Sequence, residues 1–475
     1  MAQPAQSNKP EIDVVPIITG LMQRGRKAME SLRGASQERV DEAVTALAWS
    51  IYKPENARAL AEMAVKDTGL GNVESKIIKN TRKTFGALRD LMRAKTVGII
   101  EEDPARGLVK YGKPVGIVAA ICPSTNPAAT PVNKAMMAVK GGNAVVIAPS
   151  PAGLVTTTRT VDLMREELVK AGFDPDLVQV LPAPVNKALT HELMRQVDLI
   201  VCTGSQNNVR QAYSSGTPAI GVGAGNVPVI IDAGADYDDA AEKICASKTF
   251  DNSTSCSSEN SLVIVEDAFD DAIAALKRAG GYMANDLERQ RIIDTLWVDG
   301  HLNRHIIAKD APVLAEAFGL PEEAKASKFF MAMETGVGKE FPLSDEKLSL
   351  VLTVYKVKDF DAAVAKVEEI LKYKGAGHSC GIHTKDMAKP TRLAEELDVV
   401  RVLVNQAHTF GNGGSFNNGL NFTLSMGCGT WGGNSISENV NYRHFINVTH
   451  LVKTVGEDKP SEEELFGKHW SKYGQ

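Results

Sequence analysis

The sequence predicts an α/β protein with more than one domain, built around parallel β-sheets. Its 475 residues are too many for one compact hydrophobic core, so two or three domains are expected. From position 115 onward, short apolar runs alternate with amphipathic segments, which is the pattern of strands and helices in a parallel sheet. The apolar runs also lack in–out alternation, which is typical of strands buried on both faces.

The first domain is predicted to bind a cofactor. Apolar residues recur every three or four positions from about 14 to 95, which predicts helices. Loops that follow parallel strands line a ligand crevice, so residues 1–95 and 115–232 are assigned to this domain. Strands are expected at 115–122, 143–149, 177–182, 198–204 and 227–232, with helices at 128–140, 154–171, 186–196 and 205–214.

Three further segments complete the predicted organisation. Residues 96–114 contain two extended runs separated by DPARG, which predicts a β-hairpin. A second α/β unit is expected at 233–443, where segments such as ADYDDAAEKICASKTF and SLVIVED read as helix and strand. The polar tail at 455–475 has no packed pattern of its own.

Composition excludes several classes of function. The net charge is −5 and no long basic run is present, so nucleic acid and anionic membranes are not expected partners. No apolar stretch approaches the roughly 20 residues that span a bilayer, and the N-terminus lacks a secretion signal, so a cytoplasmic protein is predicted. His301 and His305 lack the glutamate of an HExxH site, and no cysteines show CxxC spacing, so no metal is predicted.

Two segments contain candidate catalytic residues. Cys256 lies in SKTFDNSTSCSSENSLVIV, a polar loop of small residues between a predicted helix and strand. Small polar neighbours leave room for a carbonyl group to approach the sulfur, unlike the apolar surroundings of a structural cysteine. Asn126 follows a buried strand in ICPSTNPAATP, where its amide can donate to a developing oxyanion. Taken singly, each residue has an alternative interpretation: Cys256 as a loop cysteine without a catalytic role, and Asn126 as a turn residue that satisfies the local backbone.

Two glycine-containing segments are candidates for nucleotide binding. Thr203, Gly204 and Ser205 lie between a predicted strand and helix, where a glycine and a helix N-terminus favour phosphate binding. The run AIGVGAGNVPVII contains Gly225 but not the GxGxxG spacing, and it precedes a strand instead of following one. It is therefore not a dinucleotide fingerprint.

Together and in this order, these segments resemble the coenzyme-A-acylating branch of the aldehyde dehydrogenase superfamily. The resemblance covers roughly residues 15–455 and rests on FDNSTSCSSE, PSTNP, GVGAGNVP and SMGCGTWGGNSISENV. It implies an aldehyde dehydrogenase-like fold with a nicotinamide-cofactor domain and a catalytic domain at 233–443. It also implies that Cys256 is the nucleophile and that Asn126 holds the oxyanion. Hydrolytic relatives carry a general-base glutamate at the position of Val222, which cannot take a proton, so coenzyme A is the expected acyl acceptor.

The same resemblance implies the cofactor contacts. Glu346 matches the glutamate that holds the nicotinamide ribose, and Gly204 and Ser205 would lie near the pyrophosphate. Thr203 and Gly225 are also assigned to cofactor binding. Hydrolytic relatives place a lysine and a glutamate on the adenosine ribose, where this chain has Ala148 and Pro151. Because no carboxylate repels a 2′-phosphate there and Ser150 can donate to one, NADP is favoured and NAD is possible.

Within this branch the chain resembles acylating sulfoacetaldehyde dehydrogenases, which implies sulfoacetaldehyde and sulfoacetyl-CoA as substrates. His408, in the amide-rich segment 405–418, is the candidate contact for the sulfonate. Acetaldehyde, propionaldehyde or another short-chain aldehyde is the alternative, followed by a hydrolytic aldehyde dehydrogenase, a phosphate-activated reductase and a non-catalytic protein. The resemblance also implies a homodimer or homotetramer that assembles through the hairpin 96–114 and a strand at about 444–454, where subunit pairing can cover unpaired strand edges.

Overall fold

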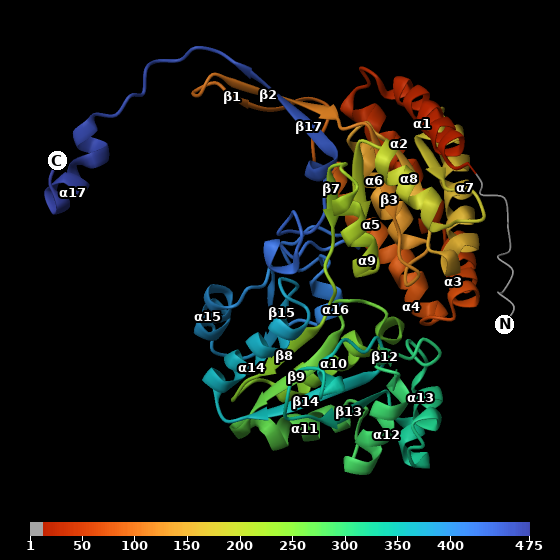
Figure 1. The fold of residues 1–475 in the computed structure, drawn as a ribbon, viewed down its shortest axis with the longest axis vertical. Coiled ribbons are helices and arrows are strands. Elements are labelled where there is room, and N and C mark those ends of the chain that lie inside the picture. Colours follow the sequence, from red (N-terminus) through yellow and green to blue (C-terminus); the bar gives the residue numbers. More distant parts are fainter. Residues whose placement is uncertain (1–12) are drawn as a thin grey trace, which may run out of the picture.

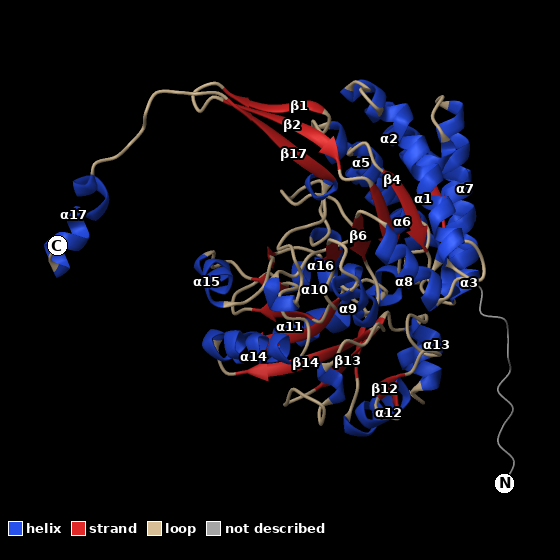
Figure 2. Cartoon of the chain, turned by 45° about the horizontal axis from the view of Figure 1, so that its top comes forward, coloured by secondary structure: helices blue, strands red, loops and turns tan. Residues whose placement is uncertain are grey.

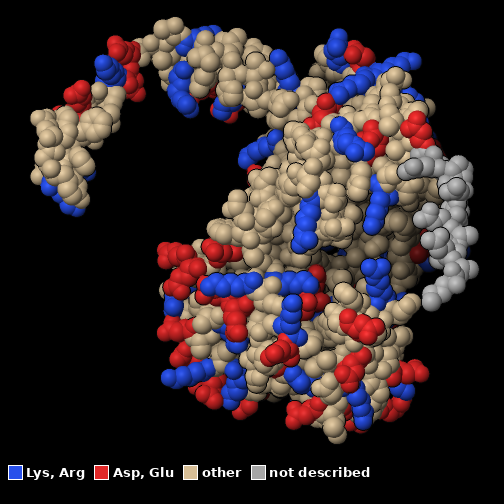
Figure 3. Space-filling model, viewed as in Figure 1, with Lys and Arg blue, Asp and Glu red and all other residues tan. Residues whose placement is uncertain are grey.

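A computed structural model describes residues 13–475, and the first twelve residues of the predicted cofactor domain lie outside this part. Two large parallel sheets form the body, and a three-stranded antiparallel arm projects from it (Figure 1). The α/β architecture predicted from the sequence is confirmed. No helix of the described chain is long and apolar enough to cross a membrane. Acidic and basic side chains are interspersed on the face shown in Figure 3.

The chain begins with a layer of helices, as the apolar spacing predicts. These helices are α1 (Val15–Met29), α2 (Gln37–Tyr52), α3 (Pro54–Thr68), α4 (Val73–Ile78) and α5 (Thr84–Met92). Their ends follow local chemistry: the Ser36 hydroxyl accepts a hydrogen bond from the Arg39 N–H at the start of α2. Gly69, with φ of +66°, ends α3. A π-helical turn at 79–83 joins α4 to α5.

The first sheet has the strand order β5-β4-β3-β6-β7 and is parallel throughout. Its strands are β3 (Ile117–Ile121), β4 (Ala144–Ala148), β5 (Val178–Val180), β6 (Leu199–Cys202) and β7 (Ala219–Gly221); its helices are α6 (Ala129–Lys140), α7 (Leu154–Lys170), α8 (Lys187–Gln196) and α9 (Gln206–Ser214). Val118 and Ala120 pack into one core cluster, whereas Ile117 and Ala119 pack into another. Burial on both faces explains the uninterrupted apolar strands.

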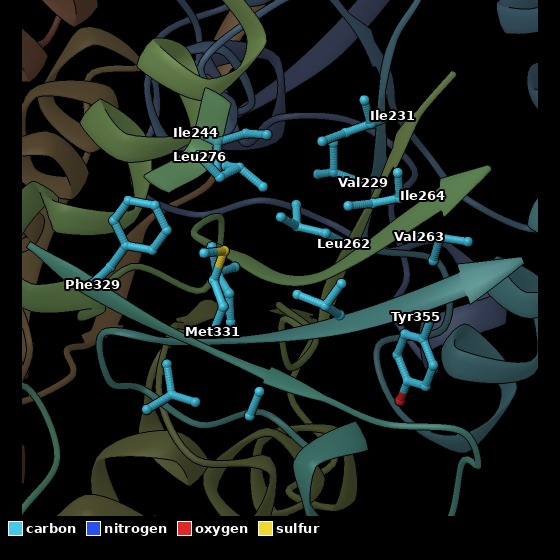
Figure 4. Close-up of a cluster of buried hydrophobic side chains, with 14 of the residues drawn as sticks. Val229, Ile231, Ile244, Leu262, Val263, Ile264, Leu276, Phe329, Met331 and Tyr355 are labelled. Atoms are coloured by element: carbon cyan, nitrogen blue, oxygen red, sulfur yellow. The ribbon is translucent and has the colours of Figure 1, made fainter. Parts of the chain in front are cut away.

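The second sheet has the order β10-β13-β14-β9-β8-β15-β16. Its strands are β8 (Val227–Ile231), β9 (Glu259–Val265), β10 (Gly281–Met283), β13 (Phe329–Met333), β14 (Val351–Val357), β15 (Cys380–His383) and β16 (Val402–Val404), with a small ribbon of β11 (Trp297–Val298) and β12 (His301–Leu302). Its helices are α10 (Tyr237–Thr249), α11 (Phe269–Arg278), α12 (Asp286–Leu296), α13 (Ala311–Ala317), α14 (Phe360–Tyr373), α15 (Ala388–Glu396) and α16 (His408–Gly411). Figure 4 shows how side chains of β8, β9, β13 and β14 pack with those of α10 and α11 in its core.

The change from one sheet to the other comes earlier than the sequence predicts. The strand expected at 227–232 forms as β8, but it pairs with β9 and β15 in the second sheet. The first sheet instead ends with β7, which pairs with β6. Both strands are short, apolar and buried, so their sequences do not reveal which sheet receives them. The chain therefore crosses between the sheets within residues 222–226.

The arm consists of the predicted hairpin and a strand from the end of the chain. Strands β1 (Gly98–Asp103) and β2 (Leu108–Pro114) are antiparallel, and β17 (Ile446–Val452) pairs with β2 along its whole length. The tail that follows is not featureless: α17 (Glu462–Tyr473) forms there, capped by Ser461. Figure 2 shows α17 standing apart from the body, beyond the end of the arm.

Candidate active site

A cavity of about 540 Å³ brings together most of the residues predicted to act in catalysis or cofactor binding. Its lining includes Asn126, Ser150, Thr203, Gly204, Ser205, Gly225, Cys256 and Glu346. They come from loops at the carboxyl ends of β3, β4 and β6, from the crossover between the sheets, and from the segments before β9 and β14. Residues up to 220 positions apart thus share one space. The rule for parallel sheets accounts for those that follow β3, β4 and β6, whereas Cys256 and Glu346 precede their strands.

Cys256 lies in the loop between α10 and β9. It is partly exposed, whereas the other five cysteines are buried. Burial within the loop, followed by the negative charge of Glu346, raises the pKa of the Cys256 thiol to about 12. The Arg401 guanidinium acts in the opposite direction. The resting sulfur is therefore a thiol that must lose its proton before it can attack a carbonyl group.

Asn126 faces the same cavity as Cys256 from the loop between β3 and α6. Its amide nitrogen lies 3.5 Å from Thr125 Oγ1, a long contact that leaves the amide able to donate elsewhere. The Cys256 N–H donates no hydrogen bond to another residue of the described chain. An amide and a free N–H on the cavity that holds the sulfur can both donate to an oxyanion.

Glu346 lies at the boundary between this cavity and a smaller one. The smaller cavity, about 10 Å³, has room for about one water molecule and is lined in part by Cys256, Glu346, Lys248 and Asn260. Burial raises the pKa of Glu346 to about 7, although the ammonium group of Lys374 opposes the shift. Burial also lowers the pKa of Lys248 to about 7. Glu346 and Lys248, whose pKa values both lie near 7, therefore share this small cavity with Cys256.

Four of the predicted cofactor residues follow β4 and β6, the two strands that flank β3 in the first sheet. The Ser205 hydroxyl caps α9 by accepting from the Asn208 N–H at 3.3 Å, and Thr203 Oγ1 lies 2.6 Å from Ser425 Oγ. Ser150, after β4, accepts from the Gly153 N–H at 3.2 Å. Hydroxyl groups and the unpaired N–H groups at the start of α9 suit the phosphates of a dinucleotide.

Gly225 lies in the crossover segment, directly against Cys256. A β-carbon there would overlap the carbonyl oxygen of Cys256. Glycine is therefore required for this close approach of two backbone segments. Val222, in the same segment, lines the cavity with a buried apolar side chain.

His408, the candidate contact for the sulfonate, is not among the residues that line the cavity. It begins α16, is only 1% exposed, and lies beneath the nucleophile loop. Its N–H donates to Glu259 Oε1 at 3.0 Å, and Nδ1 lies 2.9 Å from the Ser257 carbonyl oxygen. Burial lowers the pKa of His408 to about 4, so the ring is neutral and braces the loop next to Cys256.

Sequence reasoning missed several charged residues at the site. Lys374 lines the cavity and pairs with Asp345. Lys76 and Lys79 are buried against the nucleophile loop. Lys76 lies on α4, Lys79 begins the π-helical turn, and Lys374 follows the end of α14, so no local pattern distinguishes them from other lysines of helical segments. Between residues 13 and 475, no group of three or more His, Cys, Asp or Glu side chains is placed to hold a metal ion.

Comparisons with known proteins agree with this geometry. The sequence model of the aldehyde dehydrogenase family matches residues 18–290. The acylating sulfoacetaldehyde dehydrogenase of Cupriavidus necator is 49% identical, over 100% of this chain and 95% of that protein. An acetylating aldehyde dehydrogenase from Geobacillus thermoglucosidasius has a TM-score of 0.90 and 37% identity, over 95% of this chain and 100% of that one.

A more distant relative has been solved with an acyl group on a cysteine. The propionaldehyde dehydrogenase of Rhodopseudomonas palustris, solved with bound CoA and an acylated cysteine, has a TM-score of 0.80 and 25% identity. The match covers 92% of this chain and 97% of that one. The sequence matches and the shared fold lead to one conclusion: this chain belongs to the acylating branch of the aldehyde dehydrogenase family.

Proposed function

We propose that this enzyme interconverts an acyl-CoA and its aldehyde through a thioester on Cys256, with sulfoacetyl-CoA and sulfoacetaldehyde as the substrates. The observation that carries the proposal is the placement of Cys256 and Asn126 on one cavity whose crossover segment contributes Val222 in place of a base. The near-full-length similarity to an acylating sulfoacetaldehyde dehydrogenase supports the choice of substrate. The free cysteines of the described chain suit a reducing cytoplasm.

The chain's own residues account for the covalent steps. The Cys256 sulfur attacks the carbonyl carbon of the aldehyde, and the resulting oxyanion accepts hydrogen bonds from the Asn126 amide and the Cys256 N–H. When bound, the nicotinamide cofactor accepts the hydride that leaves this carbon. Cys256 then holds the acyl group as a thioester, and the thiol of CoA attacks it to form acyl-CoA and release the cysteine. In the reverse direction, acyl-CoA loads Cys256.

The acyl acceptor follows from the acid–base groups at the site. Water is a poor nucleophile without a base to remove its proton. Val222 has no titratable group, and Glu346 is the one carboxylate among the residues that line the main cavity of the described chain. We assign Glu346 to the ribose of the cofactor. A CoA thiol ionises far more readily than water. The absence of a general base therefore slows hydrolysis of the thioester more than it slows transfer of the acyl group to CoA.

We assign NADP as the favoured cofactor, with NAD possible. Ser150, Thr203, Gly204, Ser205 and Gly225 would hold it, and all of them line the cavity. The hydroxyl groups at this edge of the sheet fit a phosphate-rich ligand, and no acidic side chain from the loop after β4 is placed to repel a 2′-phosphate.

We further infer a homodimer or homotetramer that assembles through the arm. Leu451 and Val452 are 41% and 69% exposed on β17, whose outer edge is unpaired within the described chain. A partner subunit would cover both the apolar side chains and the strand edge.

Steady-state reduction of sulfoacetyl-CoA, acetyl-CoA and propionyl-CoA, with NADPH and NADH in parallel, tests the proposal. The expected result is the highest kcat/KM with sulfoacetyl-CoA and NADPH. Equal values for sulfoacetyl-CoA and acetyl-CoA would remove the sulfonate assignment. An NADH preference above about tenfold would overturn the choice of NADP.

A further inference from the structure

Two buried lysines hold the loop that contains the nucleophile. Lys76 lies on α4, and Lys79 begins the π-helical turn that follows. Their Nζ atoms lie 3.0 and 2.6 Å from the same atom, Oδ2 of Asp251, in the loop before Cys256. The two lysine side chains are at most 5% exposed, and the Asp251 side chain is fully buried. This cluster joins the helical layer of the first sheet to the nucleophile loop.

The nucleophile loop has an unusual backbone that depends on this cluster. Asp251, Asn252 and Ser253 have φ values of +50°, +52° and +61°, a left-handed conformation that is costly for residues other than glycine. Such a run persists only where surrounding contacts hold it in place. The Asp251 carboxylate also accepts from the Asn72 N–H at 2.9 Å, and a β-carbon at Gly71 would overlap it. The carboxylate and its partners thus fix the shape of the loop.

Lys76 makes a second contact that Lys79 does not make. Its Nζ donates to the Thr125 carbonyl oxygen at 3.1 Å, and the next residue is Asn126. Lys79 donates instead to Thr254 Oγ1, at 2.8 Å, within the nucleophile loop itself. Lys76 therefore connects the loop of Cys256 to the loop of Asn126, although the two belong to different sheets.

We infer that Lys76 is a positioning residue: by binding the Thr125 carbonyl and the Asp251 carboxylate together, it fixes the Asn126 amide relative to the Cys256 sulfur. This inference rests on the proposed function, because it takes Asn126 to be the donor to the oxyanion. Misplacement of such a donor by about 1 Å can cost about 10²-fold in rate. A buried ion pair is weak evidence for stability, since apolar replacements are often neutral or stabilising. Its value here is the geometry that it imposes.

A double-mutant cycle in kcat tests this role. Asn126→Ala is expected to lower kcat by about 10²- to 10³-fold. When Asn126 is present, Lys76→Met is expected to lower kcat about tenfold or more, with little change in KM. In the Asn126→Ala background, the same substitution is expected to lower kcat less than about twofold. Lys79→Met is the matched control, because it removes an ammonium group from the same carboxylate without breaking the bridge to Thr125. Lys79→Met is expected to lower kcat by the same factor whether residue 126 is Asn or Ala.

If Lys76→Met lowers kcat by the same factor in both backgrounds, the inference is overturned, because the effect of a purely structural role does not depend on Asn126. Thermal unfolding checks that each variant is folded; if Lys76→Met is not, the cycle is run with Lys76→Gln, which keeps a shorter neutral donor. Absence of wild-type turnover with every acyl-CoA would count against the proposed function alone. Crystal structures then decide the inference: the loop of Thr125 shifts away from Cys256 in the Lys76 variant but not in Lys79→Met. An unshifted loop would contradict it.

Discussion

Glu346→Gln is expected to make Cys256 more reactive toward iodoacetamide in the cofactor-free enzyme. Burial and the Glu346 charge together raise the pKa of the Cys256 thiol to about 12. At a pH of about 8.5, roughly 0.03% of such a thiol is ionised, against about half of an unperturbed cysteine. Glu346, whose pKa is about 7, is ionised at this pH, so its replacement removes a negative charge beside the sulfur.

The size of the effect follows from two opposing changes. Loss of the neighbouring charge is expected to lower the thiol pKa by on the order of one unit, which raises the thiolate fraction about tenfold. A thiolate of lower pKa is intrinsically less nucleophilic, by about threefold per unit. The net expectation is alkylation about threefold faster in the variant.

Alkylation of Cys256 is followed by peptide mass spectrometry between about pH 7.5 and 9.5, which separates it from the other cysteines. The wild-type rate is expected to rise almost tenfold per pH unit without a plateau, because the range lies below the thiol pKa of about 12. Asp345→Asn is the control, since this neighbouring carboxylate is not among the groups that shift the Cys256 pKa. An unchanged or slower rate in Glu346→Gln, or a wild-type plateau below about pH 8, would refute the reasoning.

Three further results are expected. Gly225→Ala should lower kcat at least about tenfold, because the added β-carbon would overlap the Cys256 carbonyl. The control, Gly419→Ala, should match wild type, because its β-carbon meets no atom within 4 Å. Equal activity of the two variants would contradict this expectation. Ser150→Ala should raise KM for NADPH by about threefold to tenfold but leave KM for NADH little changed, and a parallel rise in both would refute the 2′-phosphate contact. Replacing the exposed Val448 and Leu451 with Asp should yield folded monomers in gel filtration, and a wild-type elution volume would exclude the arm as the interface.

Local sequence patterns predicted most helices and strands, and they placed Cys256 in a loop between a helix and a strand, where it lies. The continuous apolar strands and the helical spacing before residue 95 reflect burial on both faces of a sheet, which each segment encodes by itself. The loop residues that follow β3 and β6 were found because parallel strands end at one edge. Cys256 was proposed as the nucleophile because its neighbours are small and polar, and the family resemblance added Glu346 as a cofactor contact.

Features that depend on contacts distant in sequence were not predictable. β8 and β7 have similar apolar sequences, and only pairing places them in different sheets. His408 stands in a polar segment, yet the fold buries it beneath Ser257. Lys76 and Asp251 are 175 positions apart, so no spacing rule links them. The helix α17 was not predicted because its sequence is mostly polar, although Ser461 caps its first turn.

The central claim is that the acyl group on Cys256 passes to CoA and not to water. It is tested by mixing the enzyme with sulfoacetaldehyde and NADP and measuring NADPH, acyl-CoA and free acid, with and without CoA. Without CoA, a single equivalent of NADPH per active site is expected, with no sustained release of sulfoacetate. Addition of CoA should then restore steady turnover to sulfoacetyl-CoA. Continuous formation of sulfoacetate and NADPH in the absence of CoA would contradict the account.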